Sequence, residues 1–468
     1  MNAARPRVVV LGGGFAGLLA ASAAARHAGA VTVIERDRYP ERPESRRGLP
    51  QARHPHFLAP GGVLGLERLL PGIADRLLAA GAHRIRVNAD LLFRPNVGGW
   101  MARNYTGRFG ITCSRQLLDH VVRAMVIEQD GVAVRQECEP MGLLGSATAV
   151  RGVRLRDTAA STTEQFDADL VIDATGRGSQ AGRWLDALGV VVPPPEIVDS
   201  GHTYATRVFR AVSGAESGFP AVLIQAESRS GEPGGNATLL PIEGGRWIAA
   251  VGGTRGSKLP TEDDHFIDFA RHGVSDPLIA EILAAAEPLT GTMRSRSTGN
   301  RRYRFDRIRT WPTGFVVVGD AATALNPVYG QGLSVATRCA GALGAEFARS
   351  GVGAGSAPRL QRSIIRAAAD PWQMATSQDL AFRNTEGPGQ AVLDRWMLRY
   401  GARVFRAAES RPAVATVASD VMFLARPALA MGHPAVLAGA VLGPRKPPLT
   451  EPPLTGWERG FIAGRRLG

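Results

Sequence analysis

Short unbroken runs of apolar residues mark the strands that the sequence predicts first. Such runs lie at 8–11, 31–34, 170–172 and 316–318, and each is short enough for a strand that is buried on both faces. Alanine-rich segments that predict helices follow the first and the last of them. Buried strands that alternate with helices predict an α/β fold with a parallel sheet.

A second pattern, with a period of two, fills the middle of the chain. Apolar and polar residues alternate at 203–210, 237–242 and 246–251, and the last two runs are separated by the turn 243–245. These runs predict an inserted sheet. Beyond about residue 350 the pattern becomes helical, with helices predicted at 360–370 and 393–408.

The nucleotide-binding part is predicted to be discontinuous, because its strands are separated by long inserts. Ser114 is predicted to cap a helix that belongs to it. The expected units are a Rossmann-like FAD-binding domain from 1–59, 106–190 and 301–350, a β-rich substrate-binding domain from 60–105 and 191–300, and a C-terminal helical region from 351–468.

The first strand runs into the pattern G-x-G-x-x-G, formed by Gly12, Gly14 and Gly17. Glycines in this pattern permit a tight turn and close approach to a pyrophosphate at the helix N-terminus. The next strand ends in Glu35, eighteen residues past Gly17, where a carboxylate can hold the ribose of an adenosine. The sequence therefore predicts a dinucleotide site.

The distant strand that ends in Gly319-Asp320 indicates which dinucleotide is bound. An aspartate there can accept hydrogen bonds from the ribityl hydroxyls of FAD. Gly330 and Gly332 then allow a helix N-terminus to approach the flavin pyrimidine ring, where its dipole favours the negative charge of the reduced ring. FAD is the predicted cofactor.

Composition narrows the other possibilities. Only two of the 55 basic residues are lysines, and no arginine cluster alternates with aromatic residues, so nucleic-acid binding is not expected despite the net charge of +13. The three cysteines are odd in number and lack metal-ligand spacing, which predicts no metal and a cytoplasmic protein. No apolar stretch is long enough to predict a transmembrane helix.

Several further stretches carry a resemblance to a known family. They include Arg46-Arg47-Gly48-Leu49-Pro50-Gln51-Ala52-Arg53-His54, Pro241-Ile242-Glu243-Gly244-Gly245-Arg246-Trp247 and Asn326-Pro327-Val328-Tyr329-Gly330. With the layout above, they resemble the FAD-dependent monooxygenases of the para-hydroxybenzoate hydroxylase fold, which include squalene epoxidase. Within that group the chain is most similar to the bacterial flavin-dependent epoxidases of polyether ionophore biosynthesis.

The resemblance implies a role for each residue of the cofactor site. It assigns the pyrophosphate to Gly12, Gly14 and Gly17, the ribose to Glu35, and the phosphates or ribityl chain to Arg46 and Arg115. It assigns the ribityl hydroxyls to Asp320 and the pyrimidine edge to Gly330, Gly332 and Leu333.

The resemblance also implies the activity. A flavin C4a-hydroperoxide, formed with O2 as co-substrate, epoxidises carbon–carbon double bonds of an apolar, polyketide-like or polyene-like substrate that is either free or tethered to a carrier protein. Epoxidation needs no side chain as a base, so no catalytic residue is expected. It needs dry walls, for which the aromatic candidates are Trp100, Tyr204, Phe209, Trp247 and Tyr329.

The source of electrons stays open at this point. Many relatives that bind NAD(P)H directly have Asp-Gly followed by Ser and Arg, whereas this chain has Thr175 before Gly176 and Arg183 one place late. NAD(P)H therefore acts directly or through a separate flavin reductase.

Three alternatives are weighed against the epoxidase. An aromatic hydroxylase shares the fold, and Tyr204 and His202 are its open candidates for helping a phenol to ionise. A flavin-dependent halogenase is disfavoured, because no lysine occurs before Lys258 and W-x-W-x-I-P is absent. A non-catalytic FAD-bound protein that shields a polyketide is the third.

Overall fold

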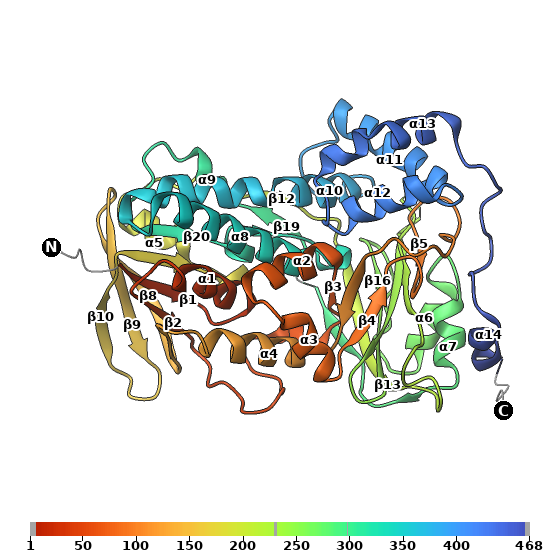
Figure 1. Ribbon diagram of the computed structural model, residues 1–468, viewed down its shortest axis with the longest axis horizontal. Helices are drawn as coiled ribbons and strands as arrows, with labels where there is room; N and C mark the ends of the chain where they lie inside the picture. The colour runs from red at the N-terminus through yellow and green to blue at the C-terminus, as the bar shows by residue number, and fades with distance from the viewer. Residues whose placement is uncertain (1–5, 229–231, 297, 464–468) are drawn as a thin grey trace.

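The two largest sheets, the helices packed around them and a cap of C-terminal helices form most of the molecule (Figure 1). The computed structural model describes residues 6–228, 232–296 and 298–463. Positions 1–5, 229–231, 297 and 464–468, which fall within the predicted domains, lie outside the described residues.

The first sheet is parallel throughout. Its strands, in spatial order, are β20 (Phe315–Val317), β11 (Leu170–Asp173), β1 (Arg7–Leu11), β2 (Ala30–Ile34) and β7 (Val132–Arg135). The four predicted apolar runs thus lie side by side, and side chains such as Val9, Val171 and Val316 are inaccessible to solvent. The α/β fold with a Rossmann-like core is confirmed.

Helices pack against this sheet and against one another. They are α1 (Phe15–Ala25), α2 (Pro60–Leu69), α3 (Ile73–Ala79), α4 (Arg115–Ile127), α5 (Ala181–Ala187), α8 (Gly332–Ser350) and α9 (Ala357–Ala367). Ser114 caps α4 as predicted, since its Oγ accepts a hydrogen bond from Leu117 N at 3.1 Å. The helix α2 packs on α8, so this part of the predicted insert 60–105 lies against the nucleotide-binding layer.

The second sheet is mixed. It contains β17 (Glu287–Pro288), β13 (Thr203–Arg210), β16 (Arg246–Gly253), β15 (Gly235–Ile242), β14 (Ala221–Ile224) and β5 (Leu91–Arg94), with β18 (Met293–Ser295) paired to β13. The predicted hairpin is present, because β15 and β16 are antiparallel and are joined by a turn with positive φ at Gly244 and Gly245. One face of the sheet packs on α6 (His265–His272) and α7 (Leu278–Leu283).

Three smaller sheets accompany the two large ones among the described residues. They are β10 (Thr163–Asp167), β9 (Val150–Asp157) and β8 (Cys138–Gly145); β12 (Glu196–Val198), β19 (Asn300–Arg302) and β21 (Thr323–Ala324); and β3 (Phe57–Leu58), β6 (Phe109–Thr112) and β4 (His83–Arg86).

The C-terminal part is helical as predicted, and most of it lies above the junction of the two sheets, whereas its last helix (Gly456–Ile462) lies beside α7 (Figure 1). It contains α10 (Ala369–Asp379), α11 (Val392–Ala408), α12 (Pro412–Met422), the 3-10 helix η7 (Ala428–Gly432), α13 (Pro434–Leu442) and α14 (Gly456–Ile462). The predicted helix 360–370 breaks at Ala368, where α9 ends and α10 begins. Among the described residues, no helix has the length and apolar character needed to cross a membrane.

Candidate cofactor and substrate site

A cavity of about 1530 Å³ lies at the carboxyl ends of the parallel strands. Ligands of open α/β sheets bind at this edge. The residues that follow β1, β2, β11 and β20 all line the cavity. The predicted site residues that it brings together are Gly12, Gly14, Glu35, Arg46, Arg115, Tyr204, Asp320, Gly330, Gly332 and Leu333.

The three glycines of the first motif do different things. Gly12 has φ +94°, which favours glycine at the turn between β1 and α1. Gly17 does not line the cavity; a Cβ added there meets the Gly12 carbonyl oxygen at 1.8 Å, so it permits close packing of helix on strand. A Cβ added at Gly14 has no atom within 4 Å, because Gly14 faces the open cavity.

A second helix N-terminus opens into the same cavity. Asn326 accepts a hydrogen bond from Val328 N at 3.2 Å and begins a short 3-10 turn, which ends at Gly330 with φ +64°. The helix α8 then starts at Gly332, and a Cβ added at Gly330 or Gly332 has open space around it. The free N–H groups of its first turn suit an electronegative ligand.

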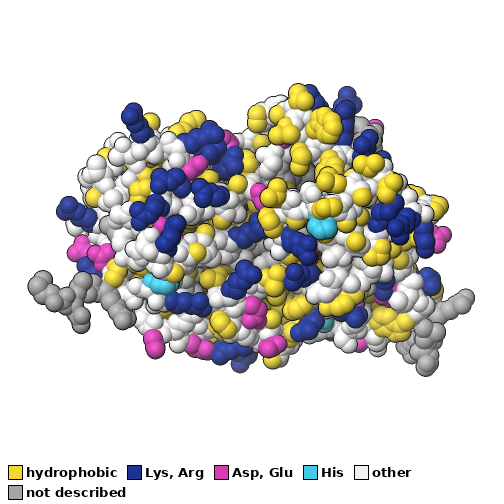
Figure 2. All heavy atoms as spheres, turned by 45° about the horizontal axis from the view of Figure 1, so that its top comes forward, with side chains coloured by type: hydrophobic (Ala, Val, Ile, Leu, Met, Phe, Trp, Pro, Cys, Tyr) yellow, Lys and Arg dark blue, Asp and Glu magenta, His cyan; other side chains and the backbone are white. Residues whose placement is uncertain are grey.

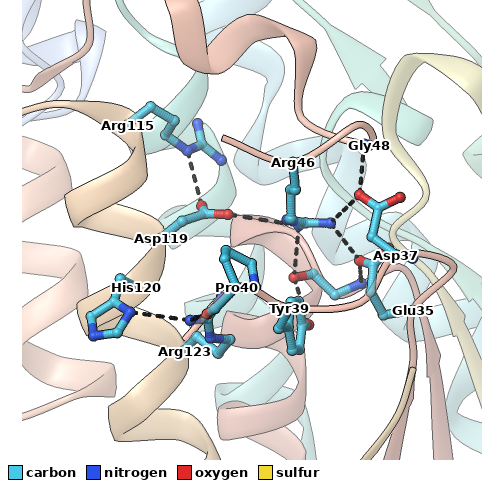
Figure 3. Close-up of polar contacts among 11 residues, drawn as sticks. Glu35, Asp37, Tyr39, Pro40, Arg46, Gly48, Arg115, Asp119, His120 and Arg123 are labelled. Carbon is cyan, nitrogen blue, oxygen red and sulfur yellow. Dashed lines mark hydrogen bonds and ion pairs between the residues drawn. The ribbon is translucent and has the colours of Figure 1, made fainter. Parts of the chain in front are cut away.

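A buried network of charges forms one wall of the cavity (Figure 3). The Arg46 guanidinium contacts Glu35 at 3.0 Å, Asp37 at 3.1 Å and Asp119 at 3.6 Å, measured from nitrogen to oxygen. Glu35 also accepts hydrogen bonds from Gly13 N and Asp37 N. Burial lowers the pKa of Arg46, but the carboxylates of Glu35 and Asp119 outweigh it and raise that pKa overall.

Arg115 joins this network from α4. Its Nε donates to Asp119 Oδ1 at 3.0 Å, and its guanidinium lies over the Phe15 ring at 5.5 Å. Among contacts between described residues, only Nε has a hydrogen-bond partner, and Arg115 lines the cavity. Its terminal nitrogens are therefore available to an anionic ligand.

Asp320, which follows β20, also lines the cavity. Desolvation raises the pKa of its carboxyl, while Arg177 and Arg115 lower it. Arg177 Nε lies 3.9 Å from Asp320 Oδ2, and the same guanidinium donates to the carbonyl oxygens of Gly299 and Leu325. Arg177 therefore ties the segment after β11 to the segment before α8.

An inner chamber continues from the large cavity between the second sheet and the C-terminal helices. Two smaller cavities share its walls, and we call them together the inner chamber; the shared residues are Leu223, Asn236, Thr238, Val328, Tyr329, Gln331, Met422 and Phe423. Among the described residues, three buried oxygens that line it, Asn236 Oδ1, Gln331 Oε1 and Ser334 Oγ, have no hydrogen-bond partner.

His54 and Tyr204 stand where the chamber meets the large cavity, since both line both spaces. Their rings pack edge to face with centroids 4.6 Å apart, and His54 Nδ1 lies 2.9 Å from Thr206 Oγ1. Burial, with a smaller effect of Arg53, lowers the pKa of His54 to about 4, and burial raises the pKa of Tyr204. Both side chains are therefore uncharged near pH 7.

The other aromatic candidates are divided between the chamber and a core. Tyr329 lines the chamber. Trp100, Phe209 and Trp247 line none of these cavities and are fully buried in the cluster between the second sheet and α6 and α7. Their positions favour a packing role.

Comparisons with known proteins agree with this geometry. Residues 7–182 match the model of the family described as FAD dependent oxidoreductase. A flavoprotein/dehydrogenase from Cytophaga hutchinsonii superimposes with a TM-score of 0.66 at 16% identity, covering 93% of this chain and 96% of that chain. The chain therefore shares the fold of that flavoprotein/dehydrogenase over nearly its whole length.

Other similar proteins span the same fold. The chain is 28% identical over 429 residues to protein Rv3254 of Mycobacterium tuberculosis (strain ATCC 25618 / H37Rv), covering 88% of each chain. PqsL, a probable FAD-dependent monooxygenase from Pseudomonas aeruginosa, superimposes with a TM-score of 0.57 at 18% identity, covering 88% of this chain and 98% of that chain. Flavin-dependent halogenases are also among the similar structures.

The large cavity suits FAD. At about 1530 Å³ it exceeds the roughly 300–1,000 Å³ of ordinary small-molecule pockets, as an extended dinucleotide requires. Gly14, Gly330 and Gly332 leave the two helix N-termini bare where a Cβ would project into the space. Arg115 supplies positive charge, and Asp320 supplies an acceptor.

Two site residues escape the sequence reasoning. In the sequence, Arg177 is noticeable only because it follows Thr175-Gly176, where many relatives that bind NAD(P)H have Asp-Gly. Asp379, on α10, accepts hydrogen bonds from Tyr329 Oη at 2.6 Å, Asn300 Nδ2 at 2.6 Å and Asn326 Nδ2 at 3.1 Å. These hydrogen bonds hold the turn before α8 in place. Asp379 lies 50 residues from Tyr329 in the sequence, so no local sequence pattern indicates this contact.

Proposed function

We propose that this protein is an FAD-dependent monooxygenase that epoxidises carbon–carbon double bonds of an apolar substrate. The observation that carries the proposal is the inner chamber, which opens into the cofactor cavity at an uncharged boundary. Apolar side chains from both sides, such as Leu223, Leu240 and Phe423, form much of its walls. An uncharged hydrocarbon chain suits such a space better than an anion does.

FAD, when bound, would supply the activation of O2. The residues proposed to hold it are Gly12, Gly14, Glu35, Arg46, Arg115, Asp320, Gly330, Gly332 and Leu333, with Gly17 allowing the close helix packing. In the overall reaction one atom of O2 enters the alkene and the other leaves as water, with two electrons from NAD(P)H, used directly or through a separate reductase.

The chain contributes position and dryness to this reaction. Phe57 and Phe423 pack edge to face with centroids 5.7 Å apart beside the chamber, where they exclude water. Tyr204 and Tyr329 can orient the substrate from opposite segments. No side chain has to remove a proton from an alkene, which agrees with the neutral boundary.

Aromatic hydroxylation is the second candidate, because neutral His54 stands at the boundary. An unprotonated imidazole can accept a proton from a phenol, although a pKa of about 4 makes His54 a weak base. Halogenation is less favoured: Lys258 and Lys446 are exposed, and no lysine is among the residues that line the three cavities.

Oxygen-isotope labelling tests the proposal. Protein reconstituted with FAD and supplied with an electron source is incubated under ¹⁸O2 with linear polyenes and, separately, with phenols. The proposal expects one labelled oxygen in a polyene epoxide. Labelled phenolic products alone would support the hydroxylase, and no labelled product from FAD-loaded protein would support the binding protein.

A chamber variant makes the test site-specific. Leu223 lines both parts of the inner chamber, so Leu223→Trp is expected to abolish product while FAD content is kept. The exposed Val191, which is 82% accessible, provides the matched control Val191→Trp, expected to keep full activity.

A further inference from the structure

The outer surface of α13 is apolar where a solvent-facing helix is normally polar. The helix has no charged side chain from Pro434 to Leu442. Leu437, Val441 and Leu442 point outward and are 47%, 82% and 67% exposed, while its other side packs on α11 and α12. A helix that is apolar all round is normally enclosed by protein or by lipid.

Neighbouring residues extend this surface. The 3-10 helix η7 is tied to α11 by a hydrogen bond from Tyr400 Oη to the Met431 carbonyl oxygen at 2.6 Å. The exposed apolar side chains of α11, η7 and α13 form what we call the apolar face: Val392, Leu393, Trp396, Met397, Leu429, Leu437, Val441 and Leu442. Figure 2 shows hydrophobic side chains gathered over the part of the molecule where Figure 1 places these helices.

Positive charge borders the apolar face. Between residues 391 and 446 the chain has eight Arg or Lys against three acidic residues, of which Glu409 and Asp420 are buried. Arg395, Arg399, Arg403 and Arg406 recur at helical spacing along α11 and are exposed. Arg445 and Lys446 follow α13 directly. An apolar helical face bordered by basic residues has the character of a surface that binds anionic lipid.

We propose that the apolar face docks reversibly on an anionic membrane surface, with its helices lying in the interface. The basic border complements lipid phosphates, whereas a second copy of this chain would present the same positive charge to it. The exposed leucines and valines would enter the acyl region, and the arginines would remain at the level of the headgroups.

The apolar face lies close to the inner chamber, so docking would bring the chamber near the membrane. Met422, Phe423 and Leu424, at the end of α12, line the inner chamber, and α12 itself packs on α11 and α13. The docking surface and the chamber therefore share one helical unit. An apolar substrate dissolved in lipid would be concentrated beside the chamber, but the docking does not depend on the proposed reaction.

Vesicle flotation with the full chain tests the docking directly. Phosphatidylcholine vesicles with about one third phosphatidylglycerol are compared with phosphatidylcholine alone, at low and high salt. The protein is expected to bind the anionic vesicles about tenfold more tightly than vesicles of phosphatidylcholine alone, because each basic residue near the surface adds to the attraction. High salt should weaken the binding to the anionic vesicles. Failure to float with anionic vesicles would overturn the proposal.

Two pairs of variants locate the contact. The double substitution Val441→Glu with Leu442→Glu is expected to weaken binding by at least about tenfold, since it puts two charges into the apolar face. Val191→Glu, at an exposed site between α5 and β12, is the control and should bind as the wild type does. Equal vesicle binding by the wild type and both variants would overturn membrane docking. So would a wild-type protein that does not bind vesicles but forms a dimer that the double substitution disrupts.

A spectroscopic readout checks the orientation. Trp396 is 68% exposed on α11, so brominated lipids should quench part of the protein fluorescence. Trp396→Phe should remove most of that quenching while the remaining six tryptophans are unaffected. Quenching that is unchanged by Trp396→Phe would mean that another face contacts the lipid.

Discussion

The charged wall of the cofactor cavity and the inner chamber handle polar groups in opposite ways. In the wall, Arg46 is surrounded by three carboxylates, and each of those carboxylates has a further protein partner or a second arginine nearby. In the chamber, charges are absent from the shared walls and buried oxygens lack partners. A buried charge without a partner costs so much free energy that the protein itself must supply the partner. An uncharged polar atom without a partner costs less, so its partner can be supplied by a ligand.

The difference indicates which region is fixed before binding. A wall whose charges are already paired keeps its geometry with or without FAD, as a permanently held cofactor requires. The chamber is held by packing and is completed by its occupant. The predictions below test this contrast, beginning with the wall.

Removing the central cation should have the largest effect. Arg46→Met would leave Glu35, Asp37 and Asp119 buried around an apolar side chain, so the free energy of unfolding should fall by about 3–5 kcal/mol. The matched control is Arg76→Met, because the Arg76 pair with Glu128 is more than half exposed on both sides and should contribute less than about 1 kcal/mol. Similar losses in denaturant unfolding of the two variants would contradict a special role for the wall.

The glycines separate folding from cofactor binding. Gly17→Ala places a methyl group 1.8 Å from a backbone oxygen, so it should lower the unfolding free energy by about 1–3 kcal/mol. Gly14→Ala places its methyl group in open cavity and should leave stability unchanged while weakening FAD binding. Thermal unfolding and the 450 nm absorbance of the purified proteins measure the two effects; a Gly14→Ala protein with full FAD content would show that the cofactor lies elsewhere.

Local patterns predict the frame of this molecule better than its site. The four apolar runs are buried and lie next to one another in the parallel sheet, as their pattern predicts, whereas the pattern does not predict the edge strand β7. Ser114 and the turn 243–245 carry local signals for a cap and a hairpin. The link from Arg46 to Asp119 has none, because Asp119 lies 73 residues further along the chain and approaches Arg46 only once α4 packs on α1 and β7.

The strand period of two carries information about which aromatic candidates share a face. Successive residues of a strand face opposite sides, so Tyr204 and Phe209, five positions apart on β13, cannot line the same cavity. Phe209 pairs directly with Trp247 across the strands, which places both on the face toward α6 and α7. The alternation of side chains along β13 is enough to place Tyr204 and Phe209 on opposite faces of the sheet. Only the three-dimensional fold shows which of the two faces meets the chamber.

Asp379 should matter less than Arg46, because three hydrogen bonds rather than an ion-pair network depend on it. Asp379→Asn puts an NH2 group against the donors Tyr329, Asn300 and Asn326, so stability should fall by about 1.5–3 kcal/mol. Tyr329→Phe removes one of these bonds and should cost about 1 kcal/mol. Equal losses would indicate that the phenol, and not the carboxylate, holds the turn before α8.

Acid should weaken the protein through its buried histidines. Burial is the main cause that lowers the pKa of His54 and His202 to about 4 and that of His56 to about 3, from 6.5. The unfolded chain therefore binds protons first, and the contribution of these groups is complete above pH 6.5 and is lost as the pH falls toward 4. His54→Gln should reduce the slope by up to about 1.4 kcal/mol per pH unit, measured by denaturant unfolding between pH 4.5 and 6.5.

The smallest expected effect is in the chamber, where a buried hydroxyl has no partner. Ser334→Ala removes an oxygen without hydrogen bonds among the described residues, so the unfolding free energy should change by less than about 0.5 kcal/mol. Ser22 is equally buried on α1, but its Oγ accepts from Gln129 Nε2 at 3.0 Å, so Ser22→Ala should cost about 1 kcal/mol. If the Ser334 hydroxyl meets the substrate, Ser334→Ala should raise KM several-fold while kcat and FAD content stay the same. A stability loss equal to that of Ser22→Ala would show that the chamber wall is satisfied without a ligand and that the contrast with the charged wall does not hold.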